Sequence, residues 1–133
     1  MRVFIDANTL ISGIVFKGYE HEVMKLAAKK KAELITSEDV LQEVLGVLQR
    51  KFPSKAYLIE EFLKLSEIKI ITKTNYRKLI EHQNIENKED LHVLAAAIAS
   101  NSEQLVTGDK QLLELKTYKG IKIVRSTQLL SQF

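Results

Sequence analysis

Short apolar runs alternate with longer helical patterns along this 133-residue chain. The runs are rich in β-branched residues, which favour strands, and they cover 3–5, 33–36, 68–71, 104–107 and 121–124. Helical patterns separate them, at about 20–31, 37–52, 55–66, 75–82 and 88–100, with short helices after Asp109 and near Thr127. Strands that alternate with helices form a parallel sheet with helices on both faces. The alternation therefore predicts an α/β fold, with one domain over residues 1–133.

The composition excludes several classes of protein. Hydrophobic residues make up 45% and charged residues 28%, as in an ordinary globular protein. No apolar run approaches the roughly 18 residues of a membrane span, and no signal peptide precedes the first strand. The absence of cysteine excludes disulfides, thiolate catalysis and cysteine-bound metals. We expect a cytoplasmic protein without a membrane partner, whose net charge of +3 permits nucleic acid binding without requiring it.

Three of the four aspartates stand at element boundaries beside buried segments. Asp6 ends the first strand, and Asp109 follows the fourth strand in VTGDK. Asp90 lies in the first turn of the apolar helix LHVLAAAIA, whereas Asp39 has a capping role. In open parallel sheets, ligands bind outside the carboxyl ends of the strands, where the strand order reverses. If the first and fourth strands are neighbours, Asp6 and Asp109 share one crevice.

A fourth acid, Glu43, lies at the edge of the apolar face of the helix 37–52 and can join this crevice. Clustered carboxylates repel one another, and a divalent cation relieves that repulsion. Mg²⁺ and Mn²⁺ prefer hard oxygen ligands, and a carboxylate-held metal can stabilise phosphoryl transfer. Convergence of these acids would therefore indicate nuclease chemistry.

Each polar residue near the crevice also has a purely structural interpretation. Helix caps, turns and solvated surface positions account for single members of the set as well, namely Asp6, Asn8, Glu43, Asp90, Thr107 and Asp109. In that interpretation Asn87 caps the helix that carries Asp90. His92 is interpreted as a packed or surface residue.

The sequence resembles the PIN-domain family, and within it the prokaryotic VapC-type nucleases that act as toxins of toxin–antitoxin systems. The resemblance rests on VFIDANTLISG, on SEDVLQEVLGVLQRKF, and on EDLHVLAAAIASNSEQLVTGDKQLLEL followed by GIKIV. It covers nearly the whole chain. It implies a three-layer α/β/α sandwich around a five-stranded parallel sheet of order 3-2-1-4-5, which makes the first and fourth strands neighbours.

The resemblance also implies a site and its partners. The family's four acids fall on Asp6, Glu43, Asp90 and Asp109, as catalytic residues and ligands of Mg²⁺ or Mn²⁺ in a ribonuclease. Asn8 and Thr107 take supporting roles. The implied partners are RNA and a cognate antitoxin protein, and a homodimer is compatible with the family.

The sequence departs from the family pattern at two positions. Ala7 stands where a hydroxyl residue is common, and Asn87 stands where many members carry a further acid. Glu86 and Glu89 are the candidate substitutes for that acid, so the departure concerns a second metal rather than the four main acids.

Basic residues provide a hypothesis for substrate binding. Lys110 is next to Asp109, and Arg50 and Lys51 end the helix 37–52. They can hold a phosphate backbone beside the acids. The alternative is that Arg50 and Lys51 simply complement the dipole at the end of their helix.

Three other functions compete with a nuclease. A haloacid-dehalogenase-type phosphatase needs a second aspartate two residues after Asp6, where this chain has Asn8, which cannot act as a general acid. A receiver-like domain needs a phosphoacceptor aspartate after the third strand, where TKTN follows Ile71. A catalytically silent PIN-fold module that binds RNA or protein stays open, and a cleavage assay discriminates it from an enzyme.

Overall fold

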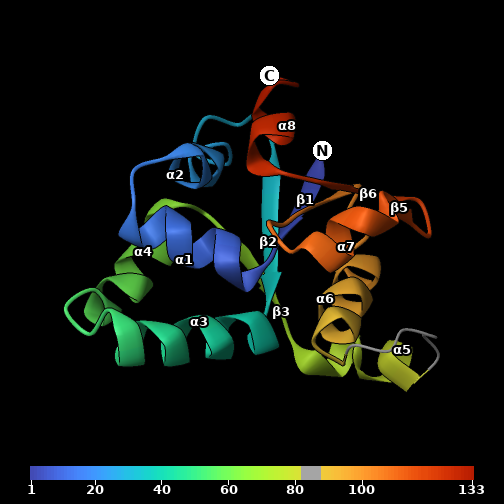
Figure 1. Ribbon diagram of the computed structural model, residues 1–133, viewed down its shortest axis with the longest axis horizontal. Coiled ribbons are helices and arrows are strands. Elements are labelled where there is room, and N and C mark those ends of the chain that lie inside the picture. Colours follow the sequence, from blue (N-terminus) through green and yellow to red (C-terminus); the bar gives the residue numbers. More distant parts are fainter. Residues whose placement is uncertain (82–87) are drawn as a thin grey trace.

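The computed structural model describes residues 1–81 and 88–133. Its centre is a six-stranded sheet with the order β3-β2-β1-β4-β6-β5 (Figure 1). The strands are β1 (Arg2–Ile5), β2 (Glu33–Ser37), β3 (Lys69–Ile71), β4 (Gln104–Val106), β5 (Thr117–Tyr118) and β6 (Ile121–Val124). All neighbours are parallel except β5 and β6, which are antiparallel.

The strand order confirms the expected topology. The five predicted strands correspond to β1, β2, β3, β4 and β6, and β1 lies between β2 and β4. The structure has one further strand, β5, which the predicted count of five omitted. It has two residues, which are too few to show an alternating pattern.

Helices cover both faces of the sheet, so the layers are those of an α/β/α sandwich. In Figure 1, α1 to α4 lie on one side of the sheet and α5 to α7 on the other. The α-helices are α1 (Ala7–Val15), α2 (Tyr19–Met24), α3 (Glu38–Lys51), α4 (Ile59–Leu65), α5 (Arg77–Glu81), α6 (Lys88–Ala99), α7 (Lys110–Leu115) and α8 (Ser126–Leu130). Two short 3₁₀ helices, η1 (Ala56–Leu58) and η2 (Lys73–Asn75), precede α4 and α5.

Two helical expectations need correction. Helix α1 was not predicted, because its sequence ANTLISGIV contains a glycine and several β-branched residues that disfavour helices. The predicted helix 20–31 ends at Met24, and turns follow it to Lys30. Lysines crowd the end of that segment, and Lys30 adopts a left-handed backbone with φ of 58°, which a continuing helix does not allow. Residue 82, at the end of the predicted helix 75–82, lies outside the described residues.

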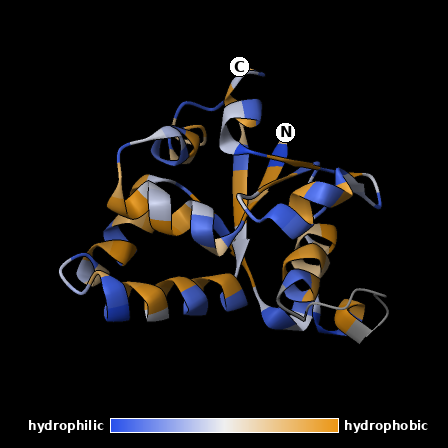
Figure 2. Ribbon diagram, viewed as in Figure 1, coloured by the Kyte–Doolittle hydropathy of each residue, from blue (hydrophilic) through white to orange (hydrophobic). Residues whose placement is uncertain are grey.

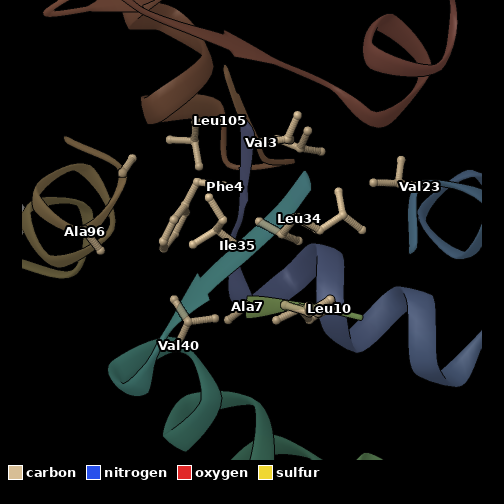
Figure 3. Close-up of a cluster of buried hydrophobic side chains, with 14 of the residues drawn as sticks. Val3, Phe4, Ala7, Leu10, Val23, Leu34, Ile35, Val40, Ala96 and Leu105 are labelled. Carbon is tan, nitrogen blue, oxygen red and sulfur yellow. The ribbon is translucent and has the colours of Figure 1, made fainter. Parts of the chain in front are cut away.

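The core lies on both faces of the central strands. Hydrophobic colours gather on the sheet and on the inward sides of the flanking helices (Figure 2). Phe4 points towards Ala96 of α6, whereas its neighbour Val3 points to the opposite face, where Val23 of α2 lies (Figure 3). This alternation is the strand period of two. Because Phe4 pairs with both Ile35 and Leu105, neighbouring strands contribute to the same face.

Helix α1 forms because its first turn is capped and its inward face is buried. Asp6 is the N-cap residue, and its side chain accepts a hydrogen bond from Thr9 N. Leu10 is fully buried. Burial and capping together outweigh the weak intrinsic helix propensity of this segment. The helix therefore begins at the end of β1, which fixes the position of Asp6.

No helix in the described part of the chain is long and apolar enough to cross a membrane.

Gly13 lies where α1 packs against α2. A Cβ built at Gly13 would lie 2.8 Å from Cγ of Met24 and 3.3 Å from the carbonyl oxygen of Glu20. Met24 is buried, so it has little room to move. This contact explains a glycine in the middle of a helix, where it otherwise costs about 0.5–1 kcal/mol relative to alanine.

We expect Gly13→Ala to lower the free energy of unfolding by about 1–2 kcal/mol, because overpacking costs roughly 1–3 kcal/mol and the gain in helix propensity offsets part of it. Urea denaturation measures the change. Gly108→Ala is the matched control, because a Cβ there meets nothing within 4 Å and should change stability by less than about 0.5 kcal/mol. Equal stability of the two variants would refute the steric role of Gly13.

Candidate active site

The first acid of the site, Asp6, is a buried carboxylate at the carboxyl end of β1. Its backbone N–H donates to the carbonyl of Val106 at 3.4 Å, which joins it to β4. Its Oδ1 accepts from Thr9 N at 3.0 Å, and the hydroxyl of Thr107 donates to Oδ2. The side chain is only 5% exposed. Both carboxylate oxygens are therefore oriented by donors from the protein.

Burial raises the pKa of the Asp6 carboxyl above its usual 3.8. Loss of hydration is the largest cause, because it disfavours the charged form. The hydrogen bonds from Thr107 and Thr9 oppose it, and the nearby negative charge of Asp109 adds a smaller upward contribution. The environment therefore favours either a proton on Asp6 or a positive charge beside it.

Asp109 follows β4 and begins α7. Its Oδ1 accepts from the N–H groups of Gln111 at 2.8 Å and Leu112 at 3.3 Å, so it is the N-cap of this helix. The N–H of Asp109 donates to the Thr107 hydroxyl oxygen at 3.0 Å. Thr107 thus links the two acids, since the same hydroxyl donates to Asp6. It is almost fully buried.

The sheet explains why Asp6 and Asp109 meet. Strands β1 and β4 are parallel neighbours, with Ile5 opposite Val106. The chain leaves both strands at the same edge, as the switch-point rule requires. A hydrogen bond of 2.9 Å from the Thr36 hydroxyl to the carbonyl of Ile5 ties this edge to β2.

Two helices contribute the other acids. Asp6, Glu43, Asp90 and Asp109 line one small cavity of about 60 Å³. Asp90 lies in the first turn of α6 and is 7% exposed. Glu43 lies on α3 and is an exposed residue, although it was expected close to the core. It occupies the rim because the buried face of α3 is formed by Val40, Val44 and Leu48.

The four acids face this cavity without converging on one point. In residues 1–81 and 88–133, no three histidine, aspartate or glutamate side chains are already grouped to hold a metal ion. The caps hold Asp6 and Asp109 at the starts of their own helices. The donor set itself fits Mg²⁺ or Mn²⁺, since these ions take hard carboxylate oxygens and keep several waters.

Asp39 has a different role from the expected cap. Ser37 is the N-cap of α3, and its side chain accepts from Val40 N at 3.2 Å. The Asp39 carboxylate accepts from the Tyr76 hydroxyl at 2.7 Å. His92 Nδ1 of α6 lies 3.2 Å from Asp39 Oδ2. These contacts join the start of α3 to α6, the two helices that carry Glu43 and Asp90.

Tyr76 is fully buried, and burial raises the pKa of its hydroxyl to about 12. The hydrogen bond to Asp39 contributes as well. The phenol therefore stays a donor at physiological pH. The charge of Lys73 lies 3.6 Å from Asp39 Oδ1 and completes the environment of this carboxylate.

The remaining predicted residues lie around the cavity in different ways. Asn8 lines it from the first turn of α1. Lys110 begins α7, and Arg50 and Lys51 end α3; all three are exposed and none is among the residues that line the acid cavity. The position of Asn87 and its substitute Glu86, and the side chain of Glu89, lie outside the described residues.

Two residues next to this site were not predicted from the sequence. Arg125 follows β6, and Tyr19 begins α2; both line a second cavity that also includes Asn8 and Thr107. The rule that selected Asp6, the residue directly after a parallel strand, also selects Arg125. No pattern in the sequence identifies Tyr19, because its position depends on how α2 packs.

Comparison with known proteins identifies the family. The sequence matches the PIN domain over residues 2–111. No curated protein is similar enough in sequence to count as a match.

Two solved structures share the fold. The structure of VapBC2 from Rickettsia felis, bound to a DNA fragment from its promoter, superimposes with a TM-score of 0.64 at 22% identity, covering 92% of this chain and 97% of that one. The Mycobacterium tuberculosis toxin VapC20, which cleaves the sarcin–ricin loop, superimposes with a TM-score of 0.56 at 16% identity, covering 90% and 98%. The family match and the arrangement of the sheet agree, and the chain belongs to the PIN-domain family.

Proposed function

We propose that this protein is a metal-dependent endoribonuclease that cleaves single-stranded RNA and acts as the toxin of a toxin–antitoxin pair. The observation that carries the proposal is the cavity lined by Asp6, Glu43, Asp90 and Asp109. Four acids from four separate elements at the carboxyl edge of a parallel sheet are costly for the fold, and a cation between them removes that cost.

In this proposal the four carboxylates hold Mg²⁺ or Mn²⁺. When bound, the ion supplies positive charge that stabilises a phosphodiester under attack by water. Asp6 is a well-oriented ligand, because the Thr9 N–H and the Thr107 hydroxyl fix its two oxygens. Thr107 is a positioning residue, since its hydroxyl donates to the Asp6 carboxylate.

The proposed substrate follows from the shape and charge of the site. The acid cavity is small and recessed, so a flexible single strand can bring a phosphate to it more easily than a rigid duplex. Lys110 is the exposed cation nearest in sequence to Asp109, and we assign it a phosphate contact, with Arg50 and Lys51 as further candidates. The VapC20 neighbour is an RNA-cleaving toxin, which supports RNA as the substrate class.

The proposed partner is a cognate antitoxin. Support comes from the neighbour VapBC2, whose structure was solved on promoter DNA. Copurification of the chain with the product of an adjacent gene tests this part of the proposal. A chain that is fully active and harmless to its host when expressed alone would contradict the toxin role.

Cleavage of a labelled single-stranded RNA tests the enzyme. We expect activity with Mn²⁺ or Mg²⁺, no activity in EDTA, and no activity in Asp109→Asn, which removes one carboxylate charge but retains a capping side chain. Thr107→Val should be milder, with a loss of about 10–100-fold, because it disturbs the orientation of Asp6.

Thr117→Val, on the exposed strand β5, is the matched control and should cleave like the unchanged protein. Equal losses for Asp109→Asn and Thr107→Val would contradict the assigned roles. Tight RNA binding without cleavage at any metal concentration would favour the catalytically silent binding module instead.

The raised pKa of Asp6 predicts how stability depends on pH without metal. In the unfolded chain this carboxyl titrates near 3.8, and in the folded protein it titrates higher. Its contribution to stability is therefore fully present below pH 3.8 and is lost as the pH rises through the raised pKa. In EDTA at pH 7 we expect Asp6→Asn to have a higher melting temperature than the unchanged protein, and this difference should shrink towards pH 4.

Addition of Mg²⁺ should reverse that order. At ten times its dissociation constant the ion adds about 1.4 kcal/mol to the unchanged protein, or roughly 5 °C in melting temperature, and little to Asp6→Asn. Calorimetry at two pH values, with EDTA and with Mg²⁺, measures both effects. If millimolar Mg²⁺ does not change the melting temperature of the unchanged protein, that result would count against the metal site.

Phosphate contacts predict salt-dependent RNA binding. Affinity measured in EDTA should fall steeply between about 50 and 200 mM salt. Lys110→Ala should weaken binding to all sequences and reduce the salt slope by about one contact. Lys64→Ala is the control, since Lys64 lies on α4, across the sheet from α7 (Figure 1). A salt-independent affinity, or equal cutting of duplex DNA, would refute this account of the substrate.

A further inference from the structure

A second cavity, about 250 Å³ in volume, lies directly beside the acid cavity. The two share Asn8 as a lining residue. The walls of the second cavity come from α1, α2, the turn after β4 and the start of α8. The lining includes Tyr19, Glu20, Gly108 and Arg125.

Parallel strands bring this cavity to the same edge of the sheet as the acids. Val106 of β4 pairs with Val124 of β6, and Thr107 N donates to the carbonyl of Val124 at 3.0 Å. The next residue of each strand, Thr107 and Arg125, therefore lies at one level. Because the Thr107 hydroxyl also bonds Asp6, Thr107 forms a wall between the two cavities.

The lining offers groups of different chemistry to a ligand. The Tyr19 side chain is 63% exposed, so its ring is available for stacking. Arg125 is exposed, and it forms no ion pair with any acid in the described ranges. Glu20 brings a carboxylate into the same cavity. A bare anion is a poor match for this lining, because Glu20 repels it.

Gly108, which also lines the second cavity, is a separate indication that a ligand approaches the backbone there. A Cβ at this position would meet nothing within 4 Å, and its backbone does not need the left-handed conformation. The fold therefore gives no reason for a glycine between Thr107 and Asp109. Glycine is, however, the residue that lets a ligand approach the backbone closely.

We propose that the second cavity holds the nucleotide next to the phosphate that is cleaved. Its base stacks on Tyr19, its phosphate contacts Arg125, and Glu20 accepts a hydrogen bond from the ribose. The volume lies just below roughly 300 Å³, the lower end for small-molecule sites, which suits one nucleotide rather than a longer stretch. This inference deepens the proposed ribonuclease function and rests on it.

Binding measured in EDTA tests the inference without cleavage. The probe is a fluorescein-labelled single-stranded RNA of ten nucleotides, followed by fluorescence anisotropy. We expect Tyr19→Ala to weaken binding at least about fivefold, because base stacking on an aromatic ring is lost, while Tyr19→Phe keeps it. Arg125→Gln should weaken binding about tenfold, since a charge-assisted contact is lost. Gly108→Ala should weaken binding as well, with an unchanged unfolding temperature.

Two variants are matched controls. Tyr57→Ala removes a tyrosine that is 77% exposed on η1, and Lys122→Gln removes an exposed charge on β6; both should bind like the unchanged protein. Unfolding temperatures of all variants show that each one folds. Binding by Tyr19→Ala and Arg125→Gln within twofold of the unchanged protein would overturn the inference.

The outcomes separate this inference from the proposed function. Cleavage by the unchanged protein in Mn²⁺, with no effect of Tyr19 or Arg125 on binding, keeps the ribonuclease and rejects the nucleotide site. RNA binding that depends on Tyr19 and Arg125, without cleavage, keeps the nucleotide site and rejects the ribonuclease. A chain that binds no RNA in EDTA rejects the nucleotide site.

Discussion

The carboxylate of Asp6 is buried where β1 ends and α1 begins, and the arrangement of the site depends on how it is held. Thr9 N–H binds one oxygen, and the Thr107 hydroxyl binds the other. The first contact starts α1, and the second joins β1 to the segment after β4. A hydrophobic residue at position 6 would lose both links, whereas asparagine could keep the cap but not the charge. The pKa of this group is raised because burial disfavours its charged form.

The acids on the helices need a second constraint, because a parallel sheet aligns only the residues that follow its strands. Glu43 and Asp90 belong to α3 and α6, which lie on opposite sides of the sheet in Figure 1. The contacts of Asp39 with Tyr76 and His92 connect the beginnings of these helices. A shift of either helix would break a partly buried contact, so the link limits how far the two acids can separate. In this way a carboxylate outside the acid cavity helps to define it.

The parts of the fold that sequence reasoning predicted are those with strong periodic patterns. The strands around Phe4, Ile35 and Leu105 are buried on both faces and read as continuous apolar runs, and their order followed from the family resemblance. Helix α1 was missed because its stability comes from the Asp6 cap and from burial, which local propensity does not include. The two-residue strand β5 was missed because it is too short for a pattern.

The candidate site shows the same division. Asp6 and Asp109 could be predicted because Asp6 directly follows β1, Asp109 lies in the short turn after β4, and β1 and β4 are adjacent. The role of Asp39 could not, since it depends on Tyr76, a residue 37 positions away in the sequence that η2 and α5 bring back to α3. Tyr19 likewise reaches the second cavity only through the packing of α2 against α1. Long-range contacts between helices leave no local pattern in the sequence, so they cannot be predicted from single segments.

The helix caps and the proposed metal site use the same carboxylates, and this sharing has a physical advantage. Asp109 Oδ1 accepts hydrogen bonds from Gln111 N and Leu112 N, and these bonds set the direction of the whole carboxylate. An ionised carboxylate has about four acceptor positions, so a cap bond leaves room for a cation. The side-chain entropy of Asp6 and Asp109 is thus lost when the protein folds, and a cation that arrives later does not have to order them again.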